Sequence, residues 1–427
     1  MFRLSRYMKD LVTPPEATAA PARRPAPLGS GPVVIWNLIR RCNLTCRHCY
    51  SSSADTDFAG ELTTAEVFRV MDDLKDAGVS VLILSGGEPL LRPDIHDIGA
   101  RAKAMGFYVG LSSNGTLMDT DAVTAIADTG YDYVGISLDG MRETHDAFRR
   151  REGAFDASLA GLRACRAAGI KVGLRFTITE HTARDLPRLL DLAADEAVDK
   201  LYFSHLNYAG RGNHNRAEDA RHRLTRSVMD TILDRCLTDT LAGSGREYVT
   251  GNNDADALYM LRWAQQRFPT RMARLEQILR RWGGNASGVG IANIDNLGIV
   301  HPDTMWWTHA LGSVRDRRFG DIWADTSDPL MAGLKQRPRP VGGRCGQCRH
   351  LAICNGNTRT RAYQLTGDPW AEDPGCYLTD AEIGLTDSST QRVQVLPFGA
   401  TPRPAPITAP GTAPGTASSP RTGEARA

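Results

Sequence analysis

Short apolar, β-branched runs recur along the first half of the chain and are separated by polar or helix-like stretches. Such runs are typical of buried strands. Six of them have this character, and a longer segment with a helical pattern follows most of them. The predicted strands are Val33–Leu38, Val81–Leu84, Tyr108–Leu111, Tyr133–Ile136, Lys171–Thr177 and Leu201–Ser204.

The intervening stretches predict amphipathic helices. Three of them end at a glycine, as helix C-termini commonly do. The predicted helices are Thr64–Ala77, Ile95–Met105, Asp121–Asp128, Phe155–Ala168 and Ala183–Ala194. Strand–helix repetition predicts a parallel sheet built from right-handed crossovers. Six units are too few for a closed eight-stranded barrel, so an open partial barrel and a doubly wound sheet both remain. In either fold, chemistry lies at the C-terminal ends of the strands.

The second half of the chain has a different pattern. Helical periodicity continues through Ile232–Leu241 and Leu258–Leu279, and a hairpin is predicted from Gly290–Ile294 and Gly298–His301. Proline-rich or Pro/Ala/Thr/Gly-rich segments at both ends lack apolar periodicity, and disorder is expected in the tail. The predicted organisation is an arm and linker at 1–31, a barrel domain at 32–222, a helical linker at 223–282, a small domain at 283–382 and a disordered tail at 383–427.

The composition limits the classes of binding partner that can be expected. The 427 residues carry 51 basic and 49 acidic side chains, a net charge of +2, which gives no bulk attraction for nucleic acid. Apolar runs are only a few residues long, and the N-terminus lacks the apolar region of a secretory signal. These features favour a cytoplasmic protein that binds neither membrane nor nucleic acid. A monomer is the working expectation.

Nine cysteines carry the most specific signal, and seven of them fall in two clusters. In a cytosolic protein such clusters more often bind metal than form disulfides. Cys165 and Cys236 stand alone in helical patterns and are interpreted as packing residues. The first cluster is Cys42, Cys46 and Cys49, directly after the first predicted strand.

Three thiolates on so short a loop suit an iron–sulfur cubane with one open iron. A zinc loop that takes a distant fourth ligand is the alternative. The Cys-x3-Cys-x2-Cys spacing in this position resembles the radical S-adenosylmethionine (SAM) superfamily. That resemblance implies a partial (β/α)6 TIM-like barrel and a [4Fe–4S] cluster bound to three cysteines and exchangeable SAM. It also implies reductive cleavage of SAM to a 5′-deoxyadenosyl radical, which takes a hydrogen atom from the substrate.

Further motifs of the superfamily follow at the ends of later strands. The string Ser85-Gly86-Gly87-Glu88-Pro89 resembles its Gly-Gly-Glu motif. Glycines permit close backbone approach, and a carboxylate can accept bonds from an ammonium group. Asp139 is expected to order the turn after the fourth strand. By resemblance, the expected SAM contacts are Gly86, Gly87, Glu88, Ser112, Asn114, Ser137 and Arg149.

The second cluster is Cys345, Cys348, Cys354 and Cys376. On spacing alone, a zinc ribbon and an iron–sulfur cluster are comparable. The pattern resembles the auxiliary-cluster domains called SPASM and twitch, which implies a second, auxiliary [4Fe–4S] cluster. The fuller SPASM pattern has seven cysteines and two auxiliary clusters. Residues 301–309 here contain no cysteine, so one auxiliary cluster is expected.

Longer strings resemble the haem d1 biosynthesis family within this superfamily. They are Phe2–Met8, Leu174–Thr177, Phe203–Gly212, His301–Thr304 and Trp370–Leu378. The resemblance implies an iron tetrapyrrole substrate, 12,18-didecarboxysiroheme. Two of its propionate side chains are removed on the way to the ring oxo groups of haem d1, a cofactor of denitrification. An electron donor such as flavodoxin or ferredoxin is implied as well.

Basic side chains near the last two predicted strands suit a substrate with several carboxylates. The candidate substrate contacts are Arg175, His205 and Arg211, with His214 and Arg216 beside them. His205, His301 and His309 could ligate a substrate iron, although hydrogen-bonding roles are the simpler interpretation.

Two alternatives remain. One is another SPASM-type enzyme that decarboxylates propionates in the alternative haem pathway or modifies a peptide. The other is a non-catalytic iron–sulfur or zinc scaffold, which would not need Ser85–Pro89 beside the first cysteine cluster.

Overall fold

The computed structural model describes residues 1–14 and 31–385. The greater part of the predicted linker and nearly all of the predicted tail lie outside these residues. Within the described part of the chain, no helix is long and apolar enough to cross a membrane.

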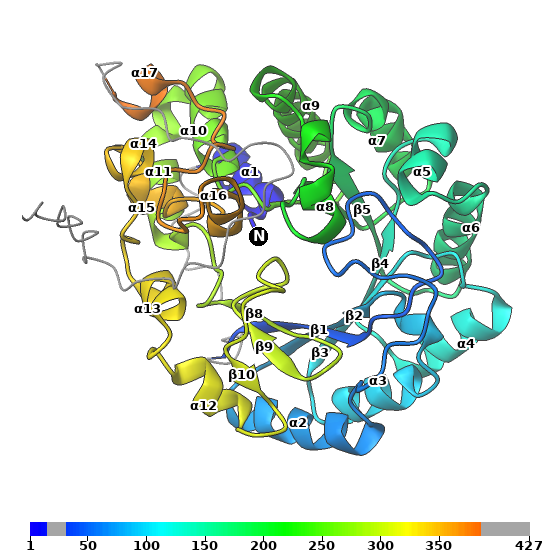
Figure 1. Ribbon diagram of the computed structural model, residues 1–427. Helices are drawn as coiled ribbons and strands as arrows, with labels where there is room; N and C mark the ends of the chain where they lie inside the picture. Colours follow the sequence, from blue (N-terminus) through cyan, green and yellow to red (C-terminus); the bar gives the residue numbers. More distant parts are fainter. Residues whose placement is uncertain (15–30, 386–427) are drawn as a thin grey trace, which may run out of the picture.

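One curved sheet organises the molecule, with helices around its outside (Figure 1). Its strand order is β10-β9-β8-β1-β2-β3-β4-β5-β6-β7, and neighbours from β8 through β1 to β7 are parallel. This arrangement confirms the partial barrel and excludes the doubly wound alternative. The first seven strands are β1 (Val33–Ile39), β2 (Val81–Gly86), β3 (Tyr108–Ser113), β4 (Tyr133–Ser137), β5 (Val172–Ile178), β6 (Lys200–His205) and β7 (Glu247–Gly251).

The predicted helices of the barrel are confirmed to within a few residues. Thr63 caps the first of them, accepting a bond from the backbone N–H of Glu66 in a capping box. The helices are α2 (Thr64–Asp76), α3 (Ile95–Ala104), α4 (Thr120–Thr129), α6 (Ala154–Ala167), α7 (Leu186–Asp195) and α9 (His222–Leu241).

Three short elements of the barrel were not predicted. They are α5 (Arg142–Arg149), α8 (Gly210–His214) and the strand β7. The α5 sequence is mostly polar, α8 has five residues, and β7 lies between two helical patterns, so none carries a clear periodic signal. Both short helices prove to lie against the functional site.

The two faces of β6 have different roles. Leu201, Phe203 and His205 are buried against the helical layer, whereas Lys200, Tyr202 and Ser204 face the barrel interior and are only partly buried. Successive side chains of a strand point to opposite faces, so this division follows from position alone.

Glycines on the inner face make room for tyrosines. A Cβ at Gly173 would lie 2.1 Å from the hydroxyl of Tyr133, and one at Gly251 would lie 2.2 Å from the hydroxyl of Tyr202. The interior is therefore lined by aromatic rings from β4 and β6. These rings pack over the glycine backbone of the neighbouring strands β5 and β7.

The first residues do not form an arm. Helix α1 (Leu4–Val12) packs against α9, α11 and β7, and Phe2 pairs with Thr250 of β7. The Phe2 ring is 1% exposed and lies 4.8 Å from the ring of Tyr7 and 4.9 Å from that of Trp282. The prediction was wrong here because a helix this short, followed by a proline-rich stretch, shows its apolar face over barely two turns.

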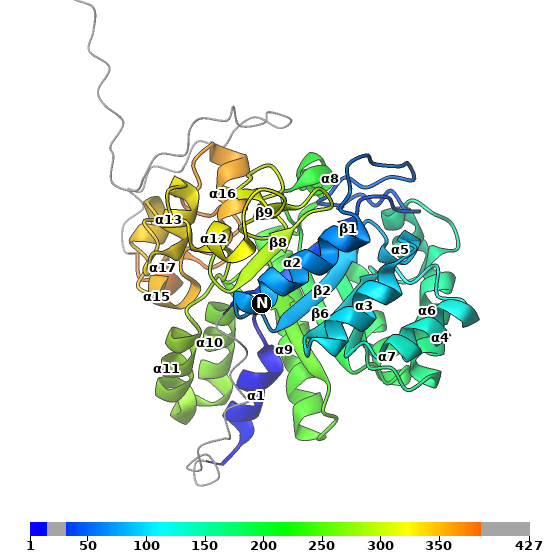
Figure 2. The ribbon, with the colours of Figure 1, turned by 90° about the horizontal axis from the view of Figure 1, so that it is seen from below.

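The C-terminal hairpin is confirmed, but its sheet is not separate. β8 (Ile291–Ile294) pairs in parallel with β1, from Val33 opposite Ile291, and continues into β9 (Ile299–His301) and β10 (Gly312–Ser313). Figure 2 shows the C-terminal helices gathered at one end of this extended sheet. They are α12 (Phe319–Ala324), α13 (Pro329–Lys335), α14 (Gly343–Gly346), α15 (Leu351–Cys354), α16 (Arg359–Thr366) and α17 (Asp380–Ile383).

The predicted helix Leu258–Leu279 is two helices. α10 (Asp256–Arg267) and α11 (Met272–Trp282) are separated by a short 3-10 turn that begins at Pro269. Proline lacks the N–H that the helix interior needs, so the break occurs where the chain carries it. One core cluster includes residues of the barrel, of these helices and of the C-terminal segment.

The packing of the first residues generates a stability prediction. Phe2→Ala should lower the free energy of unfolding by about 3–5 kcal/mol, the range for truncating a buried aromatic ring. Arg6→Ala is the matched control, because Arg6 is exposed on α1, the helix that follows Phe2, and it should change stability by less than about 0.5 kcal/mol. Denaturant unfolding measures both variants. Equal stability of the two would show that the Phe2 ring adds nothing to the core.

Candidate active site

The cysteine loop, residues 42–49, leaves the end of β1 and brings three thiols together. Cys42 and Cys46 are buried in one small cluster with Leu44, and Cys49 packs against it. Burial raises the pKa of the Cys42 thiol to about 12. Such a group remains a neutral thiol unless a bound metal deprotonates it.

Hydrogen-bond donors face these sulfur atoms. The Leu44 N–H lies 3.4 Å from Cys42 Sγ, Arg149 Nη1 lies 3.5 Å from Cys46 Sγ, and Asn114 Nδ2 lies 3.9 Å from Cys42 Sγ. Donors of this kind stabilise the negative charge of cluster-bound thiolates. The donor set therefore fits a cluster held by Cys42, Cys46 and Cys49.

Two unpredicted helices hold the loop from opposite sides. On the α5 side, the Arg47 N–H donates to Phe148 O, and the His48 ring stacks on Phe148 at 4.5 Å. On the α8 side, Arg211 Nε donates to Cys46 O at 2.7 Å, and a Cβ at Gly210 would lie 2.3 Å from Tyr50 O. The loop conformation is thus set by contacts from both flanks.

Gly86 and Gly87 allow the ends of β1 and β2 to touch. A Cβ at Gly86 would lie 2.4 Å from Ile39 O, and one at Gly87 would lie 2.2 Å from Arg41 O. The Gly87 N–H donates to Ile39 O at 2.7 Å. Because Gly86 and Gly87 have no side chain, the backbone that leads into the cysteine loop can pack directly against them.

Glu88 lies next to this junction and is 0% exposed. Its carboxylate accepts bonds from the Asn114 N–H and Ser113 Oγ, both at 2.8 Å, and from the Leu90 N–H at 3.2 Å. Burial raises the pKa of Glu88 to about 7, although these bonds favour the charged form. The carboxylate joins the strand ends of β2 and β3.

Arg149 ends α5 and is buried beside the cysteine loop. It forms an ion pair with Asp139, whose carboxylate also accepts the Thr177 N–H at 2.6 Å. Burial alone would raise the pKa of Asp139, but Arg149, the neighbouring histidines and the Thr177 N–H together outweigh burial and lower it. Asp139 thus orders the turn after β4, as expected. The Arg149 Nε has no hydrogen-bond partner among the described residues, so one donor remains for a ligand.

The interior of the barrel near the cysteine loop is polar. Arg175 on β5 hydrogen-bonds Ser112 on β3, and its guanidinium lies 5.7 Å from the ring centre of Tyr202. Ser137 on β4 is opposite Arg175 in the strand register. Ser112, Ser137 and Arg175 therefore meet inside the barrel, as their positions at strand ends predicted.

Other predicted substrate residues lie elsewhere. His205 faces the helical layer, where its Nε2 lies 3.0 Å from Asp256, and it lines a cavity together with Arg216, so its contact with a substrate stays a prediction. Side chains alternate between the two faces of β6, and His205 lies on the same face as Leu201 and Phe203. Arg211 holds backbone carbonyls of Cys46 and Ser53.

The remaining candidates do not gather around the barrel interior either. His214 is exposed, and Arg216 is buried at the outer rim. His301 is fully engaged, with Nδ1 against His309 O at 2.8 Å and Nε2 against Asp295 at 3.3 Å. His309 lies 2.9 Å from Asp328. These contacts favour hydrogen-bonding roles for both histidines.

The C-terminal cysteine site consists of Cys345, Cys348, Cys354 and Cys376, which line one narrow cavity with apolar neighbours such as Leu258. The Asp373 N–H and the His350 N–H lie 3.4 Å from Cys345 Sγ and Cys348 Sγ. Burial raises the pKa of Cys345 to about 11. Four thiols around one narrow cavity, with N–H donors beside two of the sulfur atoms, fit a fully ligated cluster.

No group of three or more His, Cys, Asp or Glu side chains within the described ranges is arranged around a single metal ion. Cys165 and Cys236 are buried in the core, as predicted.

Sequence reasoning missed several residues that shape the site. Asn43 accepts a bond from Asn114 at 2.8 Å and donates to Thr116 at 2.9 Å. Tyr50 accepts a bond from Asn37, whose side-chain oxygen in turn accepts one from Asn293 of β8. Asn43 and Tyr50 lie inside and directly after the cysteine motif, which is the signal that could have identified them.

The comparisons with known proteins agree with this geometry. A family model described as the Radical SAM superfamily matches residues 36–193. The pre-heme d1 synthase of Dinoroseobacter shibae is 53% identical over 403 residues, which cover 93% of this chain and 97% of that protein. The Fe-coproporphyrin III synthase of Methanosarcina barkeri is 44% identical over 360 residues, which cover 84% of this chain and 90% of that protein.

Among solved structures, the crystal structure of SuiB from Streptococcus suis has the same fold. Its TM-score is 0.64 at 16% sequence identity, and the alignment covers 82% of this chain and 78% of that chain.

The junction of β1 and β2 generates a prediction about the cysteine loop. Gly87→Ala should displace the backbone of Arg40 and Arg41 and lower the iron bound by reconstituted protein, with the loss confined to the N-terminal site. Gly320→Ala is the control, because a Cβ there meets only Ala77 Cβ at 3.5 Å, an ordinary contact. Iron analysis and electron paramagnetic resonance (EPR) of the reduced proteins measure the outcome. Undiminished N-terminal signal in Gly87→Ala would contradict the steric argument.

Proposed function

Since this chain belongs to the radical SAM superfamily and is an enzyme of that class, we propose that it removes two propionate side chains from an iron tetrapyrrole, 12,18-didecarboxysiroheme, in haem d1 biosynthesis. The single observation that carries the substrate is the 53% identity to a pre-heme d1 synthase along nearly the whole of both chains. The name of the second relative also points to an iron tetrapyrrole.

The proposed radical-generating centre is a [4Fe–4S] cluster held by Cys42, Cys46 and Cys49. When bound together, this cluster and SAM supply a 5′-deoxyadenosyl radical. The chain's own contribution is to hold three thiols on one buried loop and to direct the donors of Leu44, Arg149 and Asn114 at their sulfur atoms. The contacts from α5 and α8 fix the conformation of this loop.

The proposed SAM site lies between the cysteine loop and the polar strand ends. Gly86, Gly87 and Glu88 form one wall, Ser112, Asn114 and Ser137 form the adjoining one, and the free Nε of Arg149 is a donor for the cofactor carboxylate. Glu88 already accepts three bonds from the chain. Its main role in this proposal is to fix the loops against which the cofactor rests.

The proposed substrate site is the barrel interior. Arg175 is the one sequence-predicted contact that faces it, and Tyr133 and Tyr202 provide flat apolar surface beside it. A guanidinium can hold a carboxylate arm of the tetrapyrrole while the aromatic rings lie against the macrocycle. Positioning the target carbon near the radical is the protein's principal task.

The C-terminal cysteine site is proposed to hold one auxiliary [4Fe–4S] cluster. Four thiols in one cavity leave no open iron, so this cluster would carry electrons or support the fold. A flavodoxin or ferredoxin is the proposed electron donor, a monomer the proposed assembly and the cytoplasm the proposed location.

The cluster assignments predict the iron content. Wild-type protein reconstituted without oxygen should bind about eight irons, four for each cubane. Replacing Cys42, Cys46 and Cys49 together by alanine should leave about four irons and abolish 5′-deoxyadenosine formation. Replacing Cys165 by alanine is the control and should change neither value. About four irons with stoichiometric zinc in the wild type would contradict the auxiliary cluster.

The reaction predicts where substrate hydrogen goes. Didecarboxysiroheme deuterated on its propionates should pass deuterium into 5′-deoxyadenosine, and two SAM molecules should be consumed for each product that has lost two side chains. Mass spectrometry of both products measures this. Simple decarboxylation, with the remaining carbons of the side chain retained on the ring, would instead support the alternative haem pathway. Absence of deuterium in 5′-deoxyadenosine would contradict hydrogen abstraction from the propionates.

A further inference from the structure

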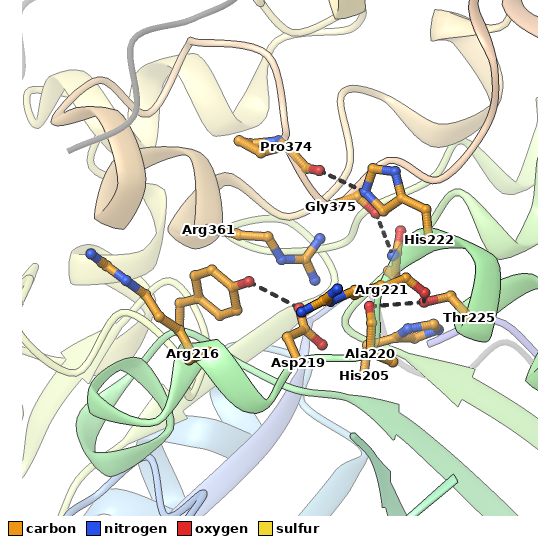
Figure 3. A pocket seen from close by; sticks show the side chains of 13 residues that line it. His205, Arg216, Asp219, Ala220, Arg221, His222, Thr225, Arg361, Pro374 and Gly375 are labelled. Carbon is orange, nitrogen blue, oxygen red and sulfur yellow. Dashed lines mark hydrogen bonds between the residues drawn. The ribbon is translucent and has the colours of Figure 1, made fainter. Parts of the chain in front are cut away.

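A second cavity of about 390 Å³ lies at the outer rim of the barrel (Figure 3). It is bounded by the end of β6, by the start of α9 and by the segment that precedes Cys376. Its charged and titratable lining residues within the described chain are Arg216, Arg221, Arg361, His205, His222, Tyr208 and Asp219. Arg221 is ion-paired with Glu180 and Arg361 with Asp373, so any attraction for an anion rests on individual donors of the cavity wall and not on net charge.

Arg361 is the most buried of these arginines. It is 2% exposed, and it is paired with Asp373 at 3.1 Å and with Asn252 O at 2.9 Å. Its Nε is buried and has no hydrogen-bond partner among the residues that the structure describes. In Figure 3 the guanidinium points toward Asp219, among the labelled side chains that line the cavity. A buried N–H without an acceptor is costly, and an anionic ligand would supply one.

The start of α9 adds a second source of positive potential. This 20-residue helix begins after Arg221, which provides no side-chain cap, and its first turn carries His222 and Thr225 of the cavity wall. The first N–H groups of a helix lack intrahelical acceptors and attract anions. This feature and the free Nε of Arg361 lie on the same cavity.

Asp219 restricts the kind of anion. Its carboxylate accepts a bond from the Tyr208 hydroxyl at 2.9 Å, and burial raises its pKa. A phosphate dianion would bring two negative charges against Asp219, whereas a carboxylate brings one, so the wall favours a carboxylate over a phosphate.

We propose that this outer cavity binds a carboxylate group, held by Arg361 and the first turn of α9. The carboxylate belongs to a free small acid or to an arm of a larger molecule, and the chemistry that recognises it is the same. The site is separate from the barrel interior, and the inference does not rest on the reaction proposed above.

The test introduces a glutamate side chain that competes with the ligand for the cavity. Ala217 lines the cavity and is exposed, so Ala217→Glu places a carboxylate at its mouth, and Ala217→Gln is the uncharged control of the same length. The full chain, purified with its clusters, is titrated calorimetrically with glutarate, with iron coproporphyrin III and with inorganic phosphate. Arg361→Lys, which keeps a positive charge beside Asp373, is a second variant. Iron content and thermal unfolding confirm that each variant is folded.

Ala217→Glu should weaken carboxylate binding roughly tenfold or more, because like charges are brought together, while Ala217→Gln should leave it nearly unchanged. Arg361→Lys should weaken it as well, because lysine loses the guanidinium fork. If glutarate shows the effect, the ligand is a free acid; if only iron coproporphyrin III shows it, the ligand is an arm of a tetrapyrrole. Equal binding by Ala217→Glu and Ala217→Gln, absence of binding to the wild type, or tighter binding of phosphate than of both carboxylates would overturn the proposal.

Discussion

The backbone contact between the end of β1 and the end of β2 is the constraint on which the site depends. At Gly86 and Gly87 the two chains approach so closely that no side chain fits between them. The carboxylate of the next residue, Glu88, is buried and accepts bonds from the Ser113 hydroxyl and the Asn114 N–H at the end of β3. These contacts join the ends of β1, β2 and β3. The cysteine loop extends from this junction.

Two helices also hold the cysteine loop in place. Helix α5 contributes Phe148 and Arg149 on one side of the loop, and α8 contributes Arg211 on the other. Both helices follow strands of the far half of the barrel. The native geometry of the loop therefore includes contacts with the segments that follow β4 and β6, so the site depends on strands from both halves of the barrel.

Much of this architecture could be predicted from the sequence, and the failures have physical reasons. The alternation of apolar runs and helices located six strands, and cysteine spacing located both thiol clusters. The pattern could not show that His205 faces the helical layer, because the end of an apolar run does not indicate which face of the strand each side chain occupies. It also could not show that Arg211 serves backbone carbonyls, since a basic residue after a strand looks the same whether it meets a ligand or the chain. Helix α1 and strand β7 were missed because each stabilises the other across a sequence separation of over two hundred residues.

The pairing of β8 with β1 also bears on how such proteins diverge. Because β8 adds directly to the strand that carries the cysteine loop, the C-terminal segment is not an independent module that can be exchanged at a linker. The side chain of Asn293 reaches across this pairing to Asn37, which in turn contacts Tyr50. A chimaera that joined this barrel to the C-terminal segment of a distant relative would have to preserve strand register and this chain of amides. Recombination within the fold is therefore restricted to partners whose edge strands match.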